Sequence, residues 1–245
     1  MTQQRTAIVT GAGKRIGRRI ASALVKDGWS VIAHVHHDED DVPDGARKVV
    51  ADLADLDCAE RIFGAAEEAP VTLLVNSAAR FHWDGFREFD PGEFDAHMAV
   101  NVRAPILLIA AFADRHRHGE DALVVNILDS KLAASNPDYL SYTLSKQALS
   151  GLTELAARAL APAGIRVNAI APGLMLQSSG QSEENFAAMH SRNPLGRGVE
   201  AEDLIAAIRY LLEARTVTGH TIMADSGHRF MNLERDVQFL DAGDD

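Results

Sequence analysis

Short runs of apolar and β-branched residues alternate with longer segments of helical periodicity along almost the whole chain. The short runs are nearly continuous in apolar residues, which is typical of strands in a parallel sheet buried on both faces. Between the first two runs, Ile16, Ile20 and Leu24 fall on one helical face, and Gly28 marks the end of the helix. The runs predicted to be strands are 6–10, 30–35, 71–76, 122–128, 165–171 and 220–225, with 47–52 as a weaker candidate.

This alternation predicts an α/β fold. Right-handed crossovers between successive parallel strands give a single-domain, Rossmann-like, doubly wound sheet of about seven strands with helices on both faces. We expect residues 1–230 to form this domain, because no Pro/Gly/Ser linker or internal repeat divides them. Residues 173–199 are polar and irregular in pattern, and are predicted to be a substrate lid. Residues 231–245 are predicted to be an acidic C-terminal tail.

Composition limits the classes of partner. The 245 residues include 24 Lys and Arg against 35 Asp and Glu, for a formal net charge of -11. Such a surface repels nucleic acid and anionic membranes, so any anionic ligand must be bound by local groups. The longest apolar run, 104–113, is far shorter than a membrane span. The sequence therefore predicts a small-molecule partner, with no nucleic acid and no membrane.

Cysteine and histidine usage narrows the chemistry. Cys58 is the single cysteine, which excludes an internal disulfide and fits a reducing compartment. Neighbouring acids would raise the pKa of its thiol, so we do not expect a catalytic cysteine. His34, His36 and His37 adjoin one strand end without a set of carboxylate ligands, and no metal site is predicted. The start of the chain lacks the pattern of an export signal, so we expect a cytoplasmic protein.

The stretch "AIVTGAGKRIGRRIA" joins the first strand to the first helix through a glycine-containing turn. Gly11 and Gly17 would let the backbone approach a pyrophosphate, while the helix N-terminus offers free N–H groups and a positive dipole end. An ordinary βα turn is the alternative, but the position after the first strand favours a dinucleotide site. Arg15 stands where a middle glycine is expected.

The end of the second strand bears on the choice of cofactor. NAD binders commonly place an acid there to hold the ribose 2′-hydroxyl. Here the strand ends in Val35, His36 and His37, and Lys14 lies in the facing turn, which favours the 2′-phosphate of NADP(H). The acids at 38–41 follow at once and oppose a phosphate unless they point outward, so NAD(H) is not excluded.

Tyr142 and Lys146 are i, i+4 neighbours and share one helix face. A lysine ammonium beside a phenol stabilises the phenolate, and so we expect it to lower the pKa of Tyr142 from its ordinary value near 10. Tyr142 is therefore predicted to be a general acid.

Over roughly residues 5–230 the chain resembles the short-chain dehydrogenase/reductases. The resemblance is carried by "TGAGKRIG", "ADL", "VNSAA", "MAVN", "YTLSK", "VNAIAPG" and "ADSG". It implies that Asn101 supports a water-mediated proton relay to Lys146, that Lys146 binds the nicotinamide ribose, and that the subunits form a homotetramer or homodimer. The other residues that it assigns to the cofactor site are Ile16, Asp52, Leu53, Asn76, Ala78, Pro172 and Gly173.

One position departs from that family. Its catalytic serine lies thirteen residues before the tyrosine and three after a strand asparagine, here Asn126, and both counts lead to Asp129. The neighbouring Ser130 would need a one-residue slip, which turns a side chain to the opposite face. Asp129 together with Arg15 resembles the branch of pteridine reductases and dihydromonapterin or dihydrofolate reductases.

That branch implies a pterin stacked on Phe81, with the substrate contacted also by Arg15, Asp129, Tyr142 and Leu174. Ala79 and Met175 depart from its usual residues. An ionised carboxylate cannot donate to a ketone oxygen, whereas it can accept from the amino group of a pterin. Burial could also raise the pKa of Asp129.

The leading hypothesis is hydride transfer from NADPH to a pterin C=N bond, with Tyr142 as proton donor backed by Asp129. A carbonyl or alcohol oxidoreductase, using Ser130 or no serine, is the second hypothesis. A non-catalytic dinucleotide sensor is the third, although a sensor has no need for Asn101, Tyr142 and Lys146 together.

Overall fold

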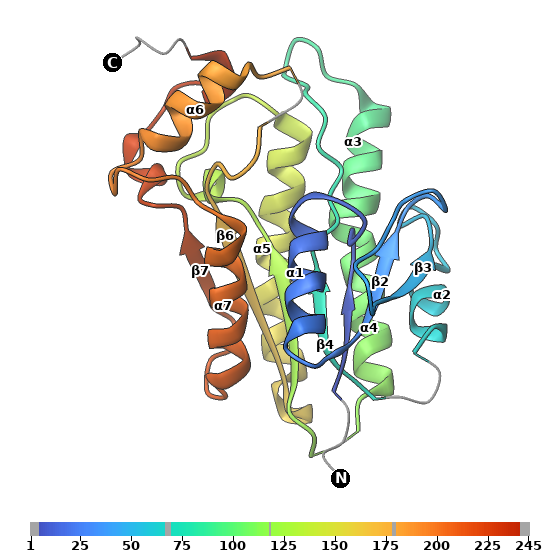
Figure 1. The fold of residues 1–245 in the computed structure, drawn as a ribbon. Coiled ribbons are helices and arrows are strands. Elements are labelled where there is room, and N and C mark those ends of the chain that lie inside the picture. The colour runs from blue at the N-terminus through green and yellow to red at the C-terminus, as the bar shows by residue number, and fades with distance from the viewer. Residues whose placement is uncertain (1–4, 67–69, 118, 178–179, 241–245) are drawn as a thin grey trace.

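Seven parallel strands form one sheet in the order β3-β2-β1-β4-β5-β6-β7 (Figure 1). The computed structural model describes residues 5–66, 70–117, 119–177 and 180–240. The predicted fold is confirmed, and the predicted strand ends differ from the observed ones by at most two residues. The strands are β1 (Thr6–Val9), β2 (Ser30–Val35), β3 (Arg47–Val50), β4 (Val71–Asn76), β5 (Ala122–Ile127), β6 (Ile165–Pro172) and β7 (Thr221–Ala224).

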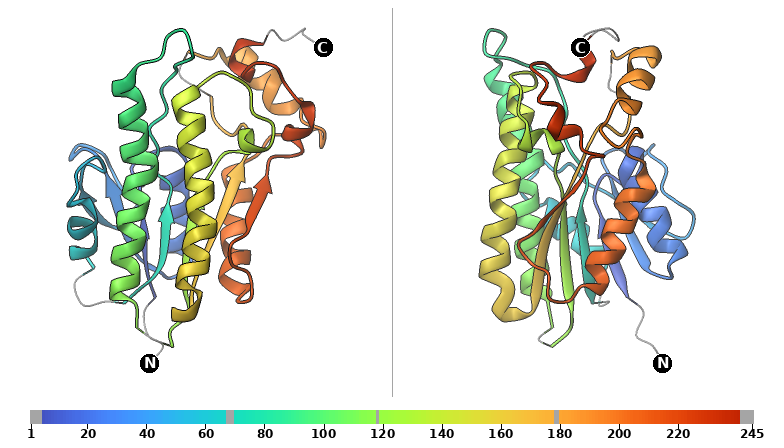
Figure 2. Two further views of the ribbon diagram at one scale, coloured as in Figure 1. Left: turned by 180° about the vertical axis from the view of Figure 1, so that it is seen from behind. Right: turned by 90° about the vertical axis from the view of Figure 1, so that its left-hand side faces the viewer.

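Helices cover both faces of the sheet (Figure 2). Helices α1 (Arg15–Lys26) and α7 (Ala201–Glu213) pack on one face, and α2 (Cys58–Gly64), α4 (Ala104–Arg115) and α5 (Leu140–Leu160) pack on the other. Successive strand side chains point to opposite faces, so Ile8 joins the core under α2 and α4 while Ala7 and Val9 join the core under α1. Both faces are thus buried, as the apolar strand pattern predicts.

Helix α3 (Pro91–Met98), the π-helical stretch η1 (Ala99–Arg103) and α4 form one continuous helical segment. This segment, Pro91–Arg115, is long and apolar enough to cross a membrane, but 56% of its most apolar window is buried inside the domain. Leu108 and Phe112 belong to the core. This apolar segment is longer than the run 104–113 seen in the sequence, and its packing against the core accounts for its apolar character.

The segment 173–199 contains a helix, α6 (Glu183–Ser191), so the expectation of irregular structure was wrong for these residues, while their role as a substrate lid stays a prediction. Ser182 caps α6 by accepting a hydrogen bond from the Asn185 backbone N–H at 3.1 Å. Residues 178–179 of the predicted lid and 241–245 of the predicted tail lie outside the described residues. Five short helical elements complete the described chain: η1, η2 (Ser130–Ala133), η3 (Ala161–Ala163), η4 (His228–Met231) and η5 (Val237–Phe239).

Candidate functional site

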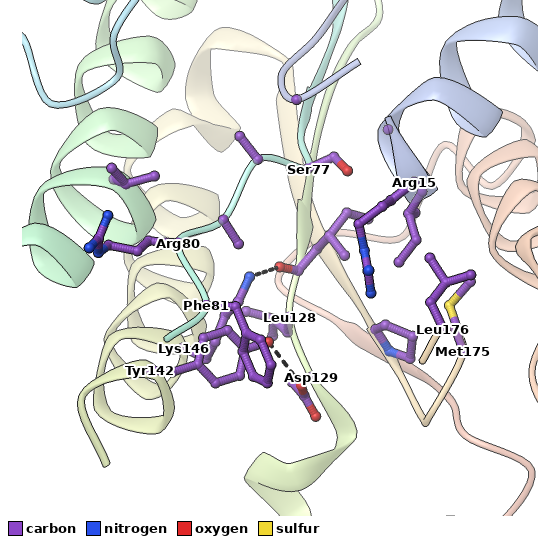
Figure 3. Close-up of a pocket in the computed structure, with 18 of the residues that line it drawn as sticks. Arg15, Ser77, Arg80, Phe81, Leu128, Asp129, Tyr142, Lys146, Met175 and Leu176 are labelled. Carbon is purple, nitrogen blue, oxygen red and sulfur yellow. Dashed lines mark hydrogen bonds between the residues drawn. The ribbon is translucent and has the colours of Figure 1, made fainter. Parts of the chain in front are cut away.

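A cavity of about 910 Å³ lies at the carboxyl ends of the strands, beside the switch point of the doubly wound sheet between β1 and β4. It reaches from Arg15, in the turn after β1, to Tyr142 on α5 (Figure 3). It also reaches the C-terminal segment, residues 233–240. All of the predicted site residues except Asn76 and Asn101 line this cavity. The predicted residues that line it are Gly11, Lys14, Arg15, Ile16, Gly17, His36, His37, Asp52, Leu53, Ala78, Phe81, Asp129, Tyr142, Lys146, Pro172, Gly173 and Leu174.

The glycine turn has the shape of a pyrophosphate cradle. A Cβ on Gly17 would lie 2.2 Å from the Gly11 carbonyl oxygen, so α1 can approach the turn only with glycine there. Gly11 adopts a φ of +68°, in the left-handed region that favours glycine. Helix α1 begins without a side-chain cap and without an acid in its first turn. Its N-terminal N–H groups can therefore bind an anion, and these residues fit a dinucleotide.

Arg15 adopts a left-handed backbone conformation with a φ of 51°. This region costs a residue with a Cβ about 1–2 kcal/mol, which explains why a glycine is expected at this position. The Arg15 guanidinium lines the cavity and donates to the Gln177 carbonyl oxygen at 3.4 Å. Arg15 therefore connects the glycine turn to the predicted lid.

His34, on β2, supports the turn from below, a role that the sequence pattern did not indicate. Its Nδ1 accepts from the Gly11 backbone N–H at 3.2 Å, so the ring proton is on Nε2, which donates to the Ala51 carbonyl oxygen at 3.0 Å. Burial lowers the pKa of His34, which keeps this tautomer neutral. The ring thus fixes the position of the turn relative to the chain after β3.

Of the acids at 38–41, which follow β2, only Asp40 lines the cavity. Asp38 forms an ion pair with Lys48 at 3.2 Å. The Asp40 carboxylate accepts from the His37 backbone N–H at 3.3 Å and lines the cavity. The end of the cavity near Lys14 therefore contains one acid from this run beside its cationic and imidazole groups.

At the other end of the cavity, the Tyr142 hydroxyl donates to Asp129 Oδ2 at 2.9 Å (Figure 3). The second carboxylate oxygen, Asp129 Oδ1, accepts from the Lys131 backbone N–H at 2.9 Å. Lys146 Nζ donates to the Ile127 carbonyl oxygen at 2.7 Å. Ser130 is buried at the first position of η2, and the phenol is bonded to Asp129. The one-residue slip that would put Ser130 at the phenol is not observed.

Burial sets the protonation of this group. It raises the pKa of Asp129 above its ordinary value, against the hydrogen bonds that favour the carboxylate. Burial and the adjacent Asp129 raise the pKa of Tyr142 well above 10, and burial lowers the pKa of Lys146 to about 8. The prediction that Lys146 lowers the pKa of Tyr142 is therefore wrong for the protein alone, because a phenolate would face a carboxylate in a buried site.

Asn76 and Asn101 are the two predicted site residues that do not line the cavity. Asn76 Nδ2 donates to Asn126 Oδ1 at 2.8 Å, which joins β4 to β5 behind the wall. Asn101 Oδ1 accepts from the Arg80 N–H at 2.7 Å, and its Nδ2 donates to Ser145 Oγ at 2.9 Å. Both side chains brace the wall, and the cofactor contact of Asn76 and the proton relay of Asn101 stay predictions.

Aromatic rings close the substrate end. Phe81 is 45% exposed, and its ring stacks on Tyr139 with centroids 4.4 Å apart and meets Tyr142 edge to face at 4.7 Å. Tyr139 in turn packs on Phe239 with centroids 6.3 Å apart. One face of Phe81 is therefore covered by Tyr139, and only its remaining surface can stack on a ligand.

The C-terminal segment is part of the site, although the predicted domain boundary at 230 left it out. Arg235 makes a bidentate pair with the buried Asp138 at 2.8 and 2.9 Å, and Lys131 Nζ lies 3.3 Å from Asp236 Oδ2. Burial raises the pKa of Asp138, but the hydrogen bonds from Arg235 and from the Asp236 N–H outweigh it and lower that pKa. The cavity-lining residues of the segment are Leu233, Arg235, Asp236 and Val237.

The described wall of the cavity reverses the charge balance of the chain. It carries seven Lys and Arg and four Asp, which suits an anionic dinucleotide. Among the described residues, no group of three or more His, Cys, Asp or Glu is placed to hold a metal ion. The cations are Lys14, Arg15, Arg80, Lys131, Lys146, Arg229 and Arg235, and the acids are Asp40, Asp52, Asp129 and Asp236.

Comparison with known proteins gives relatives over nearly the whole chain. L-xylulose reductase from Bos taurus is 34% identical over 237 residues, covering 91% of this chain and 96% of that protein. D-erythrulose reductase from Gallus gallus is 33% identical over 237 residues, covering 91% and 95%. The solved structure of FolM alternative dihydrofolate reductase 1 from Brucella canis, complexed with NADP, superimposes with a TM-score of 0.86 at 35% identity, covering 94% and 96%.

The profile of the family described as Enoyl-(Acyl carrier protein) reductase matches residues 11–229, from the glycine turn to η4. The match and the relatives agree with the seven-stranded parallel sheet and with the cavity at its carboxyl edge. The chain belongs to the short-chain dehydrogenase/reductase family and is an oxidoreductase.

Proposed function

We propose that the protein is an NADPH-dependent reductase of a C=N bond in a pterin-like heterocycle, with Tyr142 as the proton donor. The observation that supports this most directly is the 2.9 Å hydrogen bond from the Tyr142 hydroxyl to Asp129, at the position where the family has a serine hydroxyl. A carboxylate accepts hydrogen bonds and cannot stabilise a ketone oxygen, whereas the amino and N–H groups of a pterin can donate to it.

When bound, the reduced nicotinamide supplies the hydride. Tyr142 keeps its proton until transfer, because burial and Asp129 raise its pKa well above 10. Asp129 lies beside the phenol and has a raised pKa, so after transfer it can take up a proton from solvent and pass it to the phenolate. Lys146 is held by the Ile127 carbonyl oxygen and stabilises the negative charge that develops on this pair.

NADP(H) is favoured by the groups around the end of β2. Lys14, His36 and His37 line this end of the cavity, and Asp38 is paired with Lys48. Lys14 and the imidazoles can donate to a 2′-phosphate, which Asp40 opposes. The structural relatives from Brucella canis and Brucella suis were both solved with NADP.

Reduction of a sugar ketone is the second candidate function. It is favoured by the 34% identity to L-xylulose reductase over 91% of the chain. The difference between the two candidates lies at Asp129, since a hydroxyl donor suits a ketone and a carboxylate acceptor suits an aminated heterocycle.

Both candidates can be tested by NADPH oxidation with dihydrobiopterin, dihydromonapterin and dihydrofolate beside L-xylulose and D-erythrulose. We expect kcat/KM for at least one dihydropterin to exceed that for either ketose by about tenfold or more. A preference for a ketose would contradict the proposal in favour of the second candidate. NADPH binding without turnover of any substrate would instead indicate a dinucleotide sensor.

A further inference from the structure

His228 lines the cavity but does not belong to the group formed by Asp129, Tyr142 and Lys146. It is the first residue of η4, just after the turn that follows β7. Elements η4 and η2 pack against each other, and Asp129 is the N-cap of η2. His228 and Asp129 therefore reach the substrate end from two neighbouring turns that are far apart in the sequence.

Asn193 fixes the tautomer of His228. Asn193 is 3% exposed, and its Nδ2 donates to the carbonyl oxygens of His190 and Arg197, each at 3.1 Å. These two bonds orient the amide, so Asn193 Oδ1 is the atom that faces His228 Nδ1, at 2.9 Å. An amide oxygen only accepts, so Nδ1 carries the ring proton and Nε2 of the neutral ring has a lone pair.

The other side of the imidazole is available to a ligand. No described residue forms a hydrogen bond with His228 Nε2, and the ring lines the cavity. Burial lowers the pKa of His228, against the opposing charges of Asp129, Asp225 and Asp236, so the ring is neutral at pH 7. Nε2 is therefore a second hydrogen-bond acceptor at the substrate end, in addition to the Asp129 carboxylate.

We propose that His228 is a specificity-determining residue whose Nε2 accepts a hydrogen bond from an N–H group on the edge of the substrate. This inference rests on the proposed function, because the aminopyrimidine edge of a pterin has neighbouring amino and ring N–H donors. Two acceptors on adjacent turns suit such an edge, and an analogue without the amino group leaves one acceptor unpaired. Discrimination of this kind is strong where a buried polar group is left without its partner.

The test is calorimetric titration of the NADP⁺-loaded enzyme with dihydrobiopterin and with its analogue lacking the 2-amino group. His228→Phe removes the imidazole acceptor, whereas His228→Gln supplies an amide oxygen that can still accept a hydrogen bond. His220→Phe is the matched control, a His-to-Phe substitution at an exposed position that does not line the cavity. We expect His228→Phe to weaken dihydrobiopterin binding about tenfold and to affect the analogue little. His228→Gln should recover most of the affinity, and His220→Phe should leave it unchanged.

The pH dependence of binding gives a second readout that needs no loss of the ring. Protonation of Nε2 turns the acceptor into a donor. Because burial lowers the pKa of His228, wild-type affinity should fall at a pH below the ordinary imidazole pKa of about 6.5. Asp129 at the start of η2, Asp225 after β7 and Asp236 in the C-terminal segment also face this ring. Their titration remains in His228→Gln, so the difference between the two pH profiles isolates His228.

Equal affinity of wild type and His228→Phe for dihydrobiopterin, or identical pH profiles of wild type and His228→Gln, would overturn the inference and leave the proposed function intact. A wild-type enzyme that neither binds nor reduces any pterin would overturn the proposed function and this inference with it. Should thermal melting show that His228→Phe does not fold, wild type and His228→Gln still decide the question.

Discussion

Asp129 and Tyr142 hold one proton between them across 2.9 Å, and the reaction depends on which group keeps it. Burial disfavours charge on both, and the carboxylate disfavours a phenolate beside it, so the pKa of Tyr142 lies well above 10. The phenol is therefore a reserve of one proton at neutral pH. Asp129 accepts from it and has a raised pKa of its own.

Tyr142→Phe removes this proton donor and keeps the ring that meets Phe81 edge to face. We expect kcat to fall by at least about a hundredfold, as for loss of a general acid. The dissociation constant of NADPH, followed by fluorescence, should stay within about twofold. Tyr210→Phe, on the exposed part of α7, is the matched control and should retain full activity. A fully active Tyr142→Phe enzyme would remove Tyr142 from the mechanism.

Lys146 provides a prediction about stability and pH. Its pKa is about 8 in the folded protein and near 10.4 in an unfolded chain, because burial penalises the ammonium. Between these values the unfolded chain binds more protons, so the free energy of unfolding rises with pH. The difference in that free energy between wild type and Lys146→Met should increase by up to about 3 kcal/mol from pH 7 to 10.5, measured by urea denaturation without cofactor. A difference that does not change with pH would show that burial does not lower the pKa of Lys146.

At the scale of elements, the turn between β1 and α1 depends on one close approach. A Cβ on Gly17 would lie 2.2 Å from the Gly11 carbonyl oxygen, and backbone must then move. We expect Gly17→Ala to weaken NADPH binding at least tenfold and to lower the melting temperature. Gly151→Ala is the matched control, because a Cβ there meets nothing within 4 Å in helix α5, and it should stabilise the protein by up to about 1 kcal/mol. Normal NADPH binding by Gly17→Ala would contradict the role given to the turn.

The C-terminal segment depends on the pair between Arg235 and Asp138. Arg235→Gln leaves a buried carboxylate without its cation, so the segment should detach from the cavity. We expect a several-fold higher substrate KM and faster chymotrypsin cleavage at Phe239. Arg209→Gln is closely matched, because Arg209 is 52% exposed against 51% for Arg235 and also makes a bidentate pair, with Asp27 at the C-terminal end of α1. If both variants behave alike, the segment does not close the site.

The central strands could be predicted because a strand buried on both faces is apolar at most positions, which needs no knowledge of its partners, whereas β3 begins with the exposed Arg47 and Lys48 and gave a weaker signal. Helix α6 also carries a local signal that was missed, since Ser182 is followed by Glu183 and Glu184 in the first turn. The C-terminal segment carries no such signal. Its place follows from Arg235 and Asp138, which are 97 residues apart.

In the candidate site too, some features could be predicted from the sequence and others depend on tertiary contacts. Asp129 could be found by counting from Tyr142 and Asn126, because chain spacing is preserved in a family. The pKa of Tyr142 could not, since it depends on burial and on the direction of a carboxylate rather than on the i, i+4 spacing to Lys146. His228 was missed because its tautomer is set by Asn193, a contact between distant loops.

For the whole molecule, the relevant contrast is between the chain and its cavity. The chain has a net charge of -11, whereas the described cavity wall has more basic than acidic side chains. Anionic ligands are thus attracted by local groups within a repelling surface. One sheet edge brings the glycine turn, the Asp129–Tyr142 pair and the C-terminal segment to a single cavity of about 910 Å³.

The most direct test of the central claim, that a carboxyl group at the phenol selects the substrate, is the specificity of Asp129→Ser. The measurement is the ratio of kcat/KM for dihydrobiopterin to kcat/KM for L-xylulose, with NADPH saturating, in wild type and variant. We expect the ratio to fall at least tenfold in Asp129→Ser, because a hydroxyl donor replaces a carboxylate acceptor beside Tyr142. An unchanged or higher ratio, with NADPH binding intact, would contradict the assignment of Asp129 as the group that selects a pterin.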